Sequence, residues 1–449
     1  MSRDSASPSP VSTNPFRSRP FALFWVSRVL TVSGTSAQGV ALGWQVYVLA
    51  RQTHTVETSA FLVGMIGLAQ LVPVILLMLF AGVAADRYDR RRILLISYGL
   101  QAVCAGLLVG LSMLVHPPLV ALFALASLFG AAQAFMVPAN MALVHMLVPS
   151  AALPRSVAWN SIGVMSGMIV GPWLAGLLCA LSMPLTYGVV GGLYLSGVVA
   201  LLFLHVVQKV PPTEGRGPAL MLEGLRYVRS NPFVFAVLSL EFCALLLGDA
   251  SALLPVFAQD LLNVGPEGFG LLRSATAIGT GLATLVFSIV PIRRHAGLWM
   301  LGGSLLYGTA ISVFALSQTF GLSLIMLGIA GVGSSVANFI RQSIVQIVTP
   351  SHLQGRVGSV AGLCKRSSDE LSKFESGAIV LWLGPVGAAL FGGLGAIAVT
   401  LIWAKVFPEL RKADRLLAAP VPHASAPPLP HQISADDPSS LVAKSSSSP

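Results

Sequence analysis

The sequence predicts an all-α membrane protein with twelve transmembrane helices in two pseudo-symmetric halves of six. Three observations lead to this prediction. Hydrophobic residues make up 55% of the 449 residues and the mean hydropathy is +0.79, whereas soluble domains contain about 45 to 50% apolar residues. Long apolar stretches follow one another along most of the chain, and a short sequence pattern recurs after the fourth and the tenth of them.

Twelve apolar stretches are each long enough to cross a hydrocarbon core about 30 Å thick as a helix. They span residues 21–50, 59–85, 93–115, 118–147, 157–181, 184–208, 233–258, 267–291, 297–317, 320–348, 357–382 and 384–407. None is short or alternates in polarity, and in lipid the backbone polar groups must be satisfied within each segment. We therefore expect helices and exclude a β-barrel.

The placement of the basic residues predicts the orientation of these helices. The formal net charge is +10, which by itself would also suit a nucleic-acid-binding protein. If both chain ends lie on one side, 20 of the 27 lysines and arginines share that side, and only Arg51 lies on the other. Because basic residues accumulate in cytoplasmic loops, both termini are expected in the cytoplasm, and no nucleic-acid partner is expected.

The polar segments of the chain divide it into domains. The N-terminal segment lacks the layout of a cleaved signal, and the residues after Leu417 are rich in Pro, Ala and Ser, which predicts disorder. The stretch GLRYVRSNP, residues 224–232, resembles an amphipathic surface helix within a linker. The predicted organisation is a cytoplasmic N-terminal segment (1–20), a first six-helix bundle (21–208), a cytoplasmic linker (209–232), a second bundle (233–407) and a cytoplasmic, mostly disordered tail (408–449).

An internal repeat supports the division into halves. VPSAALPR, residues 148–155, recurs 201 residues later as TPSHLQGR, with Pro, Ser and Arg in register. Both copies follow corresponding helices, the fourth and the tenth. Repeats related in this way by an axis along the membrane normal place the substrate near the midplane, between the halves.

The segment GVAADRYDRRR, residues 82–92, carries six charges in eleven positions between two apolar stretches. Together with the repeat, it resembles the signature between helices two and three of the major facilitator superfamily, with Asp89 where that pattern has glycine. The matching residues are Gly82, Asp86, Arg87, Arg90 and Arg91. The resemblance implies a conformational latch in which Gly82 lets helices approach, Asp86 interacts with the start of helix eleven, and the arginines bridge carboxylates or carbonyls. The alternative is simple anchoring of a cytoplasmic loop.

The fifth apolar stretch contains SGMIVGPWLAG, residues 166–176, which resembles the Gly-Pro pattern of antiporting members of that superfamily. The matching residues are Gly167, Gly171, Pro172 and Gly176. Small residues four apart let helices pack closely and proline bends a helix. Ordinary membrane-helix packing is therefore the alternative to an antiporter motif.

Further segments narrow the resemblance to the branch that contains enterobactin exporters and macrolide-efflux transporters. They include ALGWQVY (41–47), LLPVFAQDLLNVGPEGFGLLR (253–273) and FPELRKADRL (407–416). The resemblance implies a bacterial cytoplasmic membrane and export of a siderophore or an amphiphilic drug-like molecule. The eleventh stretch departs from the pattern, because KRSSDELSKFES, residues 365–376, contains more lysine.

Three carboxylates within the apolar stretches are candidates for proton coupling. A charge at the centre of a membrane helix costs about 2.5 to 3.5 kcal/mol, so it should face a partner or a wet cavity. Glu241 and Asp249 are eight residues apart on the predicted seventh helix and would project about 80° apart. Glu375 is the third candidate. The alternative for Glu241 and Asp249 is permanent pairing with a cation.

The substrate cavity is expected to use polar side chains of helices one and ten. The candidates are Arg28, Gln38, Gln45, Asn338, Arg341 and Gln342. Arg28 and Arg341 could instead pair with the carboxylates, Arg341 could anchor a helix end, and the glutamines could bond between helices. On helix eleven, Lys365 with Asp369 and Arg366 with Glu370 have the i, i+4 spacing of ion pairs.

These observations predict a secondary active transporter that works by alternating access. We find no P-loop, no metal-ligand cluster and no catalytic triad in the sequence, so neither an enzyme nor a cofactor or metal site is expected. Transport would then use an ion gradient, most simply that of protons. The expected partners are the lipid bilayer, a small-molecule substrate and protons, and an export partner in the outer envelope is left open. The alternatives are uptake, lipid flipping, or a non-transporting membrane sensor or scaffold.

Overall fold

The computed structural model describes residues 15–148, 152–204, 217–289 and 295–410. Within these ranges the regular structure is helical and contains no strand. The predicted tail after residue 410, residues 1–14 of the predicted N-terminal segment and residues 209–216 of the predicted linker lie outside the described residues. The all-α prediction is confirmed.

Helices account for all twelve predicted stretches. They are α1 (Arg19–Arg51), α2 (Val56–Arg87), α3 (Arg90–Ser112), α4 (Leu119–Leu147), α5 (Leu153–Leu181), α6 (Met183–Leu202), α7 (Gly217–Ser230), α8 (Pro232–Gly248), α9 (Leu254–Val256), α10 (Gly265–Ile289), α11 (Ala296–Leu316), α12 (Phe320–Val348) and α13 (Gln354–Val406). Among the described residues, nine helices are long and apolar enough to cross a membrane, or ten if the bent pair α7 and α8 is one span. The prediction of twelve spans is consistent with this number of helices. Helix α1 covers the first predicted stretch, and α13, which bends at Gly384, covers the last two.

The seventh predicted stretch is broken, which corrects one expectation. Helix α8 ends at Gly248, and Asp249 is its C-cap with an extended backbone. Its carboxylate accepts hydrogen bonds from the backbone N–H and the hydroxyl of Ser251, at 2.9 and 2.8 Å. Such local bonds compete with the helical pattern. Glu241 and Asp249 therefore do not share one continuous helix, and the chain continues through α9 and a π-helical turn, Phe257–Leu261.

The last two predicted stretches form the single kinked element α13. Its backbone is helical except at Gly384, which has φ of 69° and precedes Pro385. Glycine adopts this left-handed conformation without steric cost, and proline cannot donate the hydrogen bond that a straight helix needs. The predicted boundary at residue 383 is thus a sharp bend.

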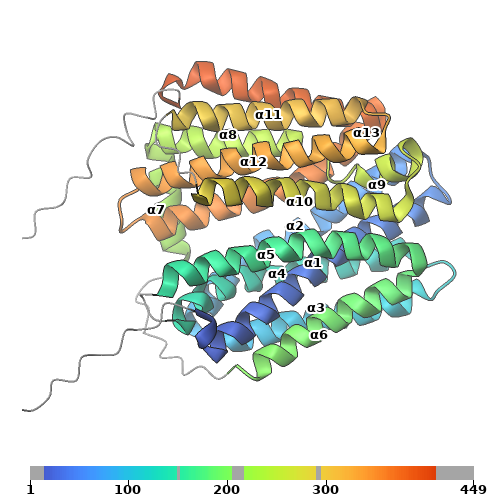
Figure 1. Cartoon of the computed structure of the whole chain (residues 1–449), viewed down its shortest axis with the longest axis horizontal. Coiled ribbons are helices and arrows are strands. Elements are labelled where there is room, and N and C mark those ends of the chain that lie inside the picture. Colours follow the sequence, from blue (N-terminus) through green and yellow to red (C-terminus); the bar gives the residue numbers. More distant parts are fainter. Residues whose placement is uncertain (1–14, 149–151, 205–216, 290–294, 411–449) are drawn as a thin grey trace, which may run out of the picture.

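The helices pack as two groups that lie against each other (Figure 1). In the first group, α1 contacts α5 and α6, α2 contacts α4, and α3 contacts α4 and α6; in the second, α12 contacts α10 and α11, and α13 contacts α8 and α11. Between the groups, α2 packs against α13 and α5 against α10. We call the end with the α1–α2 loop the Arg51 end, and the end with the α2–α3 loop the Arg87 end. Where one domain stops and the next begins stays a prediction.

Glycines of the predicted antiporter motif lie at helix contacts. A Cβ added at Gly167 would lie 2.9 Å from the backbone nitrogen of Ser33 in α1. A Cβ added at Gly171 would lie 2.5 Å from the backbone oxygen of the same Ser33. One added at Gly176 would lie 2.9 Å from the Gly270 Cα of α10. The motif therefore places α5 directly against both α1 and α10, which is the packing alternative; its part in antiport stays a prediction.

We predict that Gly171→Ala destabilises the protein by about 1 to 3 kcal/mol, because the new methyl group would press on the backbone of α1. The control is Gly106→Ala on α3, where a Cβ would meet no described atom within 4 Å. That change should be neutral or slightly stabilising, since glycine inside a helix costs about 0.5 to 1 kcal/mol. Thermal unfolding in detergent measures both. Equal melting temperatures for the two variants would contradict the close approach of α5 and α1.

Candidate functional site

A central cavity of about 440 Å³ lies between the two helix groups. Its walls come from α1, α2, α4 and α5 on one side and from α8, α10, α11, α12 and α13 on the other. This volume is within the range of small-molecule sites, about 300 to 1,000 Å³. Its aromatic lining includes Phe129, Phe269 and Tyr307. The cavity occupies the place between the halves that the internal repeat predicts for a substrate.

One side of the cavity is charged and the other is not. The charged wall consists of Asp249, Arg273, Lys365, Arg366, Asp369, Glu370 and Lys373, all from the second group. The first group contributes apolar, hydroxyl and amide side chains, among them Gln70 and Gln133. Charge in a membrane protein is stable next to a partner or water, and in this cavity the charged surface belongs to the second group.

The α13 part of the charged wall is held by ion pairs. Lys365 lies 3.5 Å from Asp369 and Arg366 lies 3.0 Å from Glu370, which confirms both predicted i, i+4 pairs. Lys373 binds the second oxygen of the same Glu370 carboxylate. Arg366 also donates a 3.0 Å hydrogen bond to Gln133 of α4, so the wall touches the opposite group at this level.

Asp249 lines the cavity at the break after α8. Besides Ser251, the hydroxyl of Ser372 on α13 donates to its carboxylate at 3.2 Å, and Ser376 donates to its backbone carbonyl at 2.8 Å. Within the described part of the chain, no ion pair joins this carboxylate to a cation. Asp249 is thus a carboxylate held by the hydroxyl groups of serines, with no ion-pair partner among the described residues.

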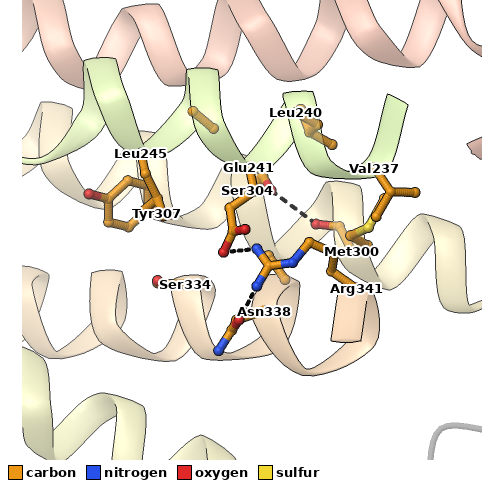
Figure 2. Close-up of a pocket in the computed structure, with 12 residues that line it drawn as sticks. Val237, Leu240, Glu241, Leu245, Met300, Ser304, Tyr307, Ser334, Asn338 and Arg341 are labelled. Atoms are coloured by element: carbon orange, nitrogen blue, oxygen red, sulfur yellow. Dashed lines mark hydrogen bonds and ion pairs between the residues drawn. The ribbon is translucent and has the colours of Figure 1, made fainter. Parts of the chain in front are cut away.

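Glu241 lies outside the central cavity, in a small adjoining pocket between α8, α11 and α12. Figure 2 shows the Arg341 guanidinium bound to Glu241 of α8 and to Asn338 of its own helix. The Arg341 and Glu241 side chains are only 7% and 8% exposed. This geometry corresponds to the alternative in which a carboxylate is paired with a cation, and it places Arg341 inside the helix bundle rather than at a helix end.

Other predicted cavity residues lie outside the central cavity in this conformation, and their part in binding a substrate stays a prediction. Gln45 accepts a 2.6 Å hydrogen bond from Tyr187 within the first group, and Gln38 is buried there. Arg28 is half-buried outside the cavity, and exposed Gln342 donates to Asn338 at 3.3 Å. Helix α1 turns both glutamines toward its own group, a rotation that an apolar helix does not reveal by its periodicity.

Glu375 is a half-buried residue of α13 outside the central cavity. It forms no hydrogen bond or ion pair with any residue that the structure describes. The cavity residue Arg273 and the residue Asp260 are not singled out by sequence reasoning. A charged residue inside or directly after a predicted apolar stretch is the signal that could have identified them.

The predicted latch residue Arg91 contacts its own helix group in this conformation. The Arg91 guanidinium donates to the Leu201 and Leu202 carbonyls of α6, both at 2.8 Å. A Cβ added at Gly82 would meet no described atom within 4 Å, so the expected close helix approach is not made here. The Asp86 side chain lies outside the described part of the structure. The latch stays a prediction.

The same loop contains the other two latch arginines and Asp89, which stands where the family pattern has glycine. Asp89 is the N-cap of α3 and accepts a 2.8 Å hydrogen bond from the Arg91 backbone N–H. Arg90 points toward the Met146 sulfur at 3.3 Å, and Arg87 is exposed. The carboxylate that stands where the family pattern has glycine therefore satisfies an unpaired N–H at the start of a helix.

The two helix groups are joined at the Arg51 end. Tyr47 and Arg51 of α1 both bind the carboxylate of Asp260, which lies in the π-helical turn of the second group. We call these three residues the Asp260 cluster. Nearby, Trp44 stacks on Phe269 of α10 with ring centroids 6.0 Å apart.

Close backbone packing continues this junction toward the middle of the bundle. Gly64 of α2 faces Gly377 of α13 so closely that an added Cβ would lie 3.0 Å from the Gly377 Cα. Gly176 near the end of α5 contacts Gly270 near the start of α10. Together with the Asp260 cluster, these contacts join the two helix groups at the Arg51 end.

We predict that Glu241→Gln and Arg341→Gln each destabilise the protein by about 3 to 5 kcal/mol, because each leaves an uncompensated buried charge. The pair Glu241→Leu with Arg341→Met removes both charges and should recover most of that loss. Thermal unfolding of the purified proteins in detergent measures the differences. Full stability of either single variant would show that the ion pair does not hold α8 to α12.

Comparison with known proteins supplies relatives of this chain. The family model described as Major Facilitator Superfamily matches residues 24–368. The enterobactin exporter EntS of Salmonella choleraesuis (strain SC-B67) is 24% identical over 400 residues, covering 87% of this chain and 93% of the relative. EntS of Escherichia coli O1:K1 / APEC is also 24% identical, over 399 residues and 92% of its length.

Solved structures of transporters share the fold at low sequence identity. The nucleoside transporter NupG matches with a TM-score of 0.66 at 14% identity, covering 87% of this chain and 98% of NupG. A bacterial homologue of the lysosomal transporter Spinster matches with a TM-score of 0.64 at 15% identity, over 90% and 98% of the two chains. The helix packing, the cavity between two helix groups and the family match agree, and the chain belongs to the major facilitator superfamily of membrane transporters.

Proposed function

We propose that the protein exports a small organic molecule across the bacterial cytoplasmic membrane by alternating access. The observation that carries this proposal is the cavity between two helix groups that are joined at the Arg51 end. With both termini in the cytoplasm, as the basic residues predict, the Arg51 end faces away from the cytoplasm. Cargo would then enter from the Arg87 end and leave when the Asp260 cluster separates.

A siderophore or an amphiphilic drug-like compound is the cargo that fits best. The curated relatives are exporters of enterobactin, and the cavity offers aromatic side chains beside a charged wall. A molecule with planar rings and polar groups would contact both surfaces. The cavity volume of about 440 Å³ suits a molecule of this size class.

Protons are the proposed coupling ion, and Asp249 is the carboxylate that we propose to carry them. It lines the cavity, it has hydroxyl donors rather than a cation as described partners, and it connects the break after α8 to α13. Protonation would remove its charge and change its bonds to Ser251 and Ser372. Glu241 is less suited to cycle protons, because its charge is balanced by Arg341.

We predict that Asp249→Asn abolishes proton movement driven by cargo in proteoliposomes, because the amide cannot titrate. A panel of siderophores and amphiphilic drugs is added in turn, and internal pH is followed with a trapped dye. Wild-type protein should move protons with at least one cargo, and Asp249→Asn should reduce that rate at least tenfold.

Glu375→Gln serves as the matched control for the coupling acid. The pair Glu241→Leu with Arg341→Met serves as the second control, because it removes the Glu241 carboxylate without leaving an uncompensated buried charge. Proton movement that survives in Asp249→Asn but disappears in either control would move coupling to the carboxylate that the control removes. Efflux of cargo that continues unchanged after the proton gradient is collapsed would refute antiport, and import of labelled cargo would refute export.

We predict that Asp260→Asn opens the Arg51 end, because it weakens the ion pair with Arg51 and the bond from Tyr47. The ratio of open to closed molecules should rise about fivefold, because a partly exposed ion pair contributes roughly 1 kcal/mol. Spin labels at His116 and Gln318, in the loops of the two groups at this end, report the separation by double electron-electron resonance in a background without the native cysteines.

The control for this measurement is Asp89→Asn at the Arg87 end, which keeps the N-cap of α3. It should leave the distance distribution unchanged. An identical distribution in wild type and Asp260→Asn would mean that the Asp260 cluster does not hold the two groups together.

A further inference from the structure

Arg273 is the cation of the charged wall that the described carboxylates leave unpaired. It lies on the face of α10 that lines the cavity, one turn from Phe269 and one turn from Ala277. No hydrogen bond or ion pair joins its guanidinium to another residue in the described part of the chain. A cation at this depth costs about 2.5 to 3.5 kcal/mol unless water or a ligand compensates it.

The neighbouring carboxylates of the charged wall have partners other than Arg273. The two oxygens of Glu370 bind Arg366 and Lys373. Asp369 is paired with Lys365, at 3.5 Å. Asp249 is held by the hydroxyls of serines. The wall contains four cations and three carboxylates. Of the four cations, Arg273 is the one that no described carboxylate pairs.

We propose that Arg273 binds the anionic group of the cargo, and that the cargo is an aromatic or amphiphilic anion such as a carboxylate. A guanidinium presents planar donors that match a carboxylate in two parallel hydrogen bonds. Phe269, one turn away on the same face and stacked on Trp44, provides a rigid surface for the rings of the same molecule. This inference rests on the proposed function, and within it favours anionic over cationic cargo.

The test compares two probes of the same shape, 1-naphthoate and its neutral amide 1-naphthamide. Equilibrium dialysis with the purified full-length protein in detergent gives a Kd for each. Wild-type protein should bind naphthoate at least fivefold more tightly than naphthamide. Arg273→Gln should weaken naphthoate binding at least tenfold and leave naphthamide within twofold, and Arg273→Lys should keep part of the preference.

Two cationic controls isolate the position from the general field. Lys365→Gln removes a cation that is already paired in the same wall, and Arg229→Gln removes an exposed cation of α7 outside the cavity. Arg229→Gln should change the naphthoate preference less than threefold, and Lys365→Gln should reduce that preference less than Arg273→Gln does. The proposal is overturned if wild type shows no preference for the anion, if Arg273→Gln keeps the preference, if that variant loses both probes equally, or if Lys365→Gln has the same effect.

The binding test and the transport test fail separately. A retained anion preference without efflux of any panel compound would reject the export proposal and leave the Arg273 site standing. Efflux of a panel compound without any preference for naphthoate over naphthamide would reject the Arg273 site and leave the export proposal standing.

Discussion

The cost of placing charge away from water is the constraint on which the rest of this structure depends. Hydrocarbon offers no hydrogen-bonding partner, so backbone groups must bond within helices and ionisable side chains must find counter-charges or a wet cavity. The chain meets the first requirement with helices throughout its described part. It meets the second in two ways, by the closed Glu241 and Arg341 pair and by the charged wall of the central cavity.

These two solutions separate structural charge from functional charge. The Glu241 and Arg341 pair is buried between α8 and α12, and each charge has a partner. The charged wall is also rich in ion pairs, yet it faces a cavity and leaves Arg273 and Asp249 without an ion-pair partner among the described residues. In the proposed mechanism, Arg273 binds a negative group of the cargo and Asp249 binds the proton that is exchanged for it.

Alternating access requires contacts that can be exchanged, and the junction between the helix groups has that character. At the Arg51 end, small residues such as Gly64 and Gly377 let helix backbones meet without interlocking side chains. The Asp260 cluster adds a polar contact on a partly exposed surface, where ion pairs contribute little and water can replace them. Such a junction is specific when closed and costs little to open.

The sequence by itself determined the helical class, the membrane location of the helices and the family, because hydropathy over a span and short motifs are local properties. It also predicted the i, i+4 pairs of α13, since helical spacing fixes which neighbours meet. It did not predict that Asp249 would end α8, because local hydrogen bonds there compete with helix propensity.

Only the tertiary structure decided which charges meet. Glu241 and Arg341 are 100 positions apart, and Tyr47 and Asp260 are 213 apart, so their pairing depends on how the two helix groups pack. The rotation of α1, which turns Gln38 and Gln45 away from the cavity, is likewise set by its neighbours. An apolar helix has no periodic polar face to fix its rotation, so sequence can name the charged residues of a cavity, but packing determines which of them line it.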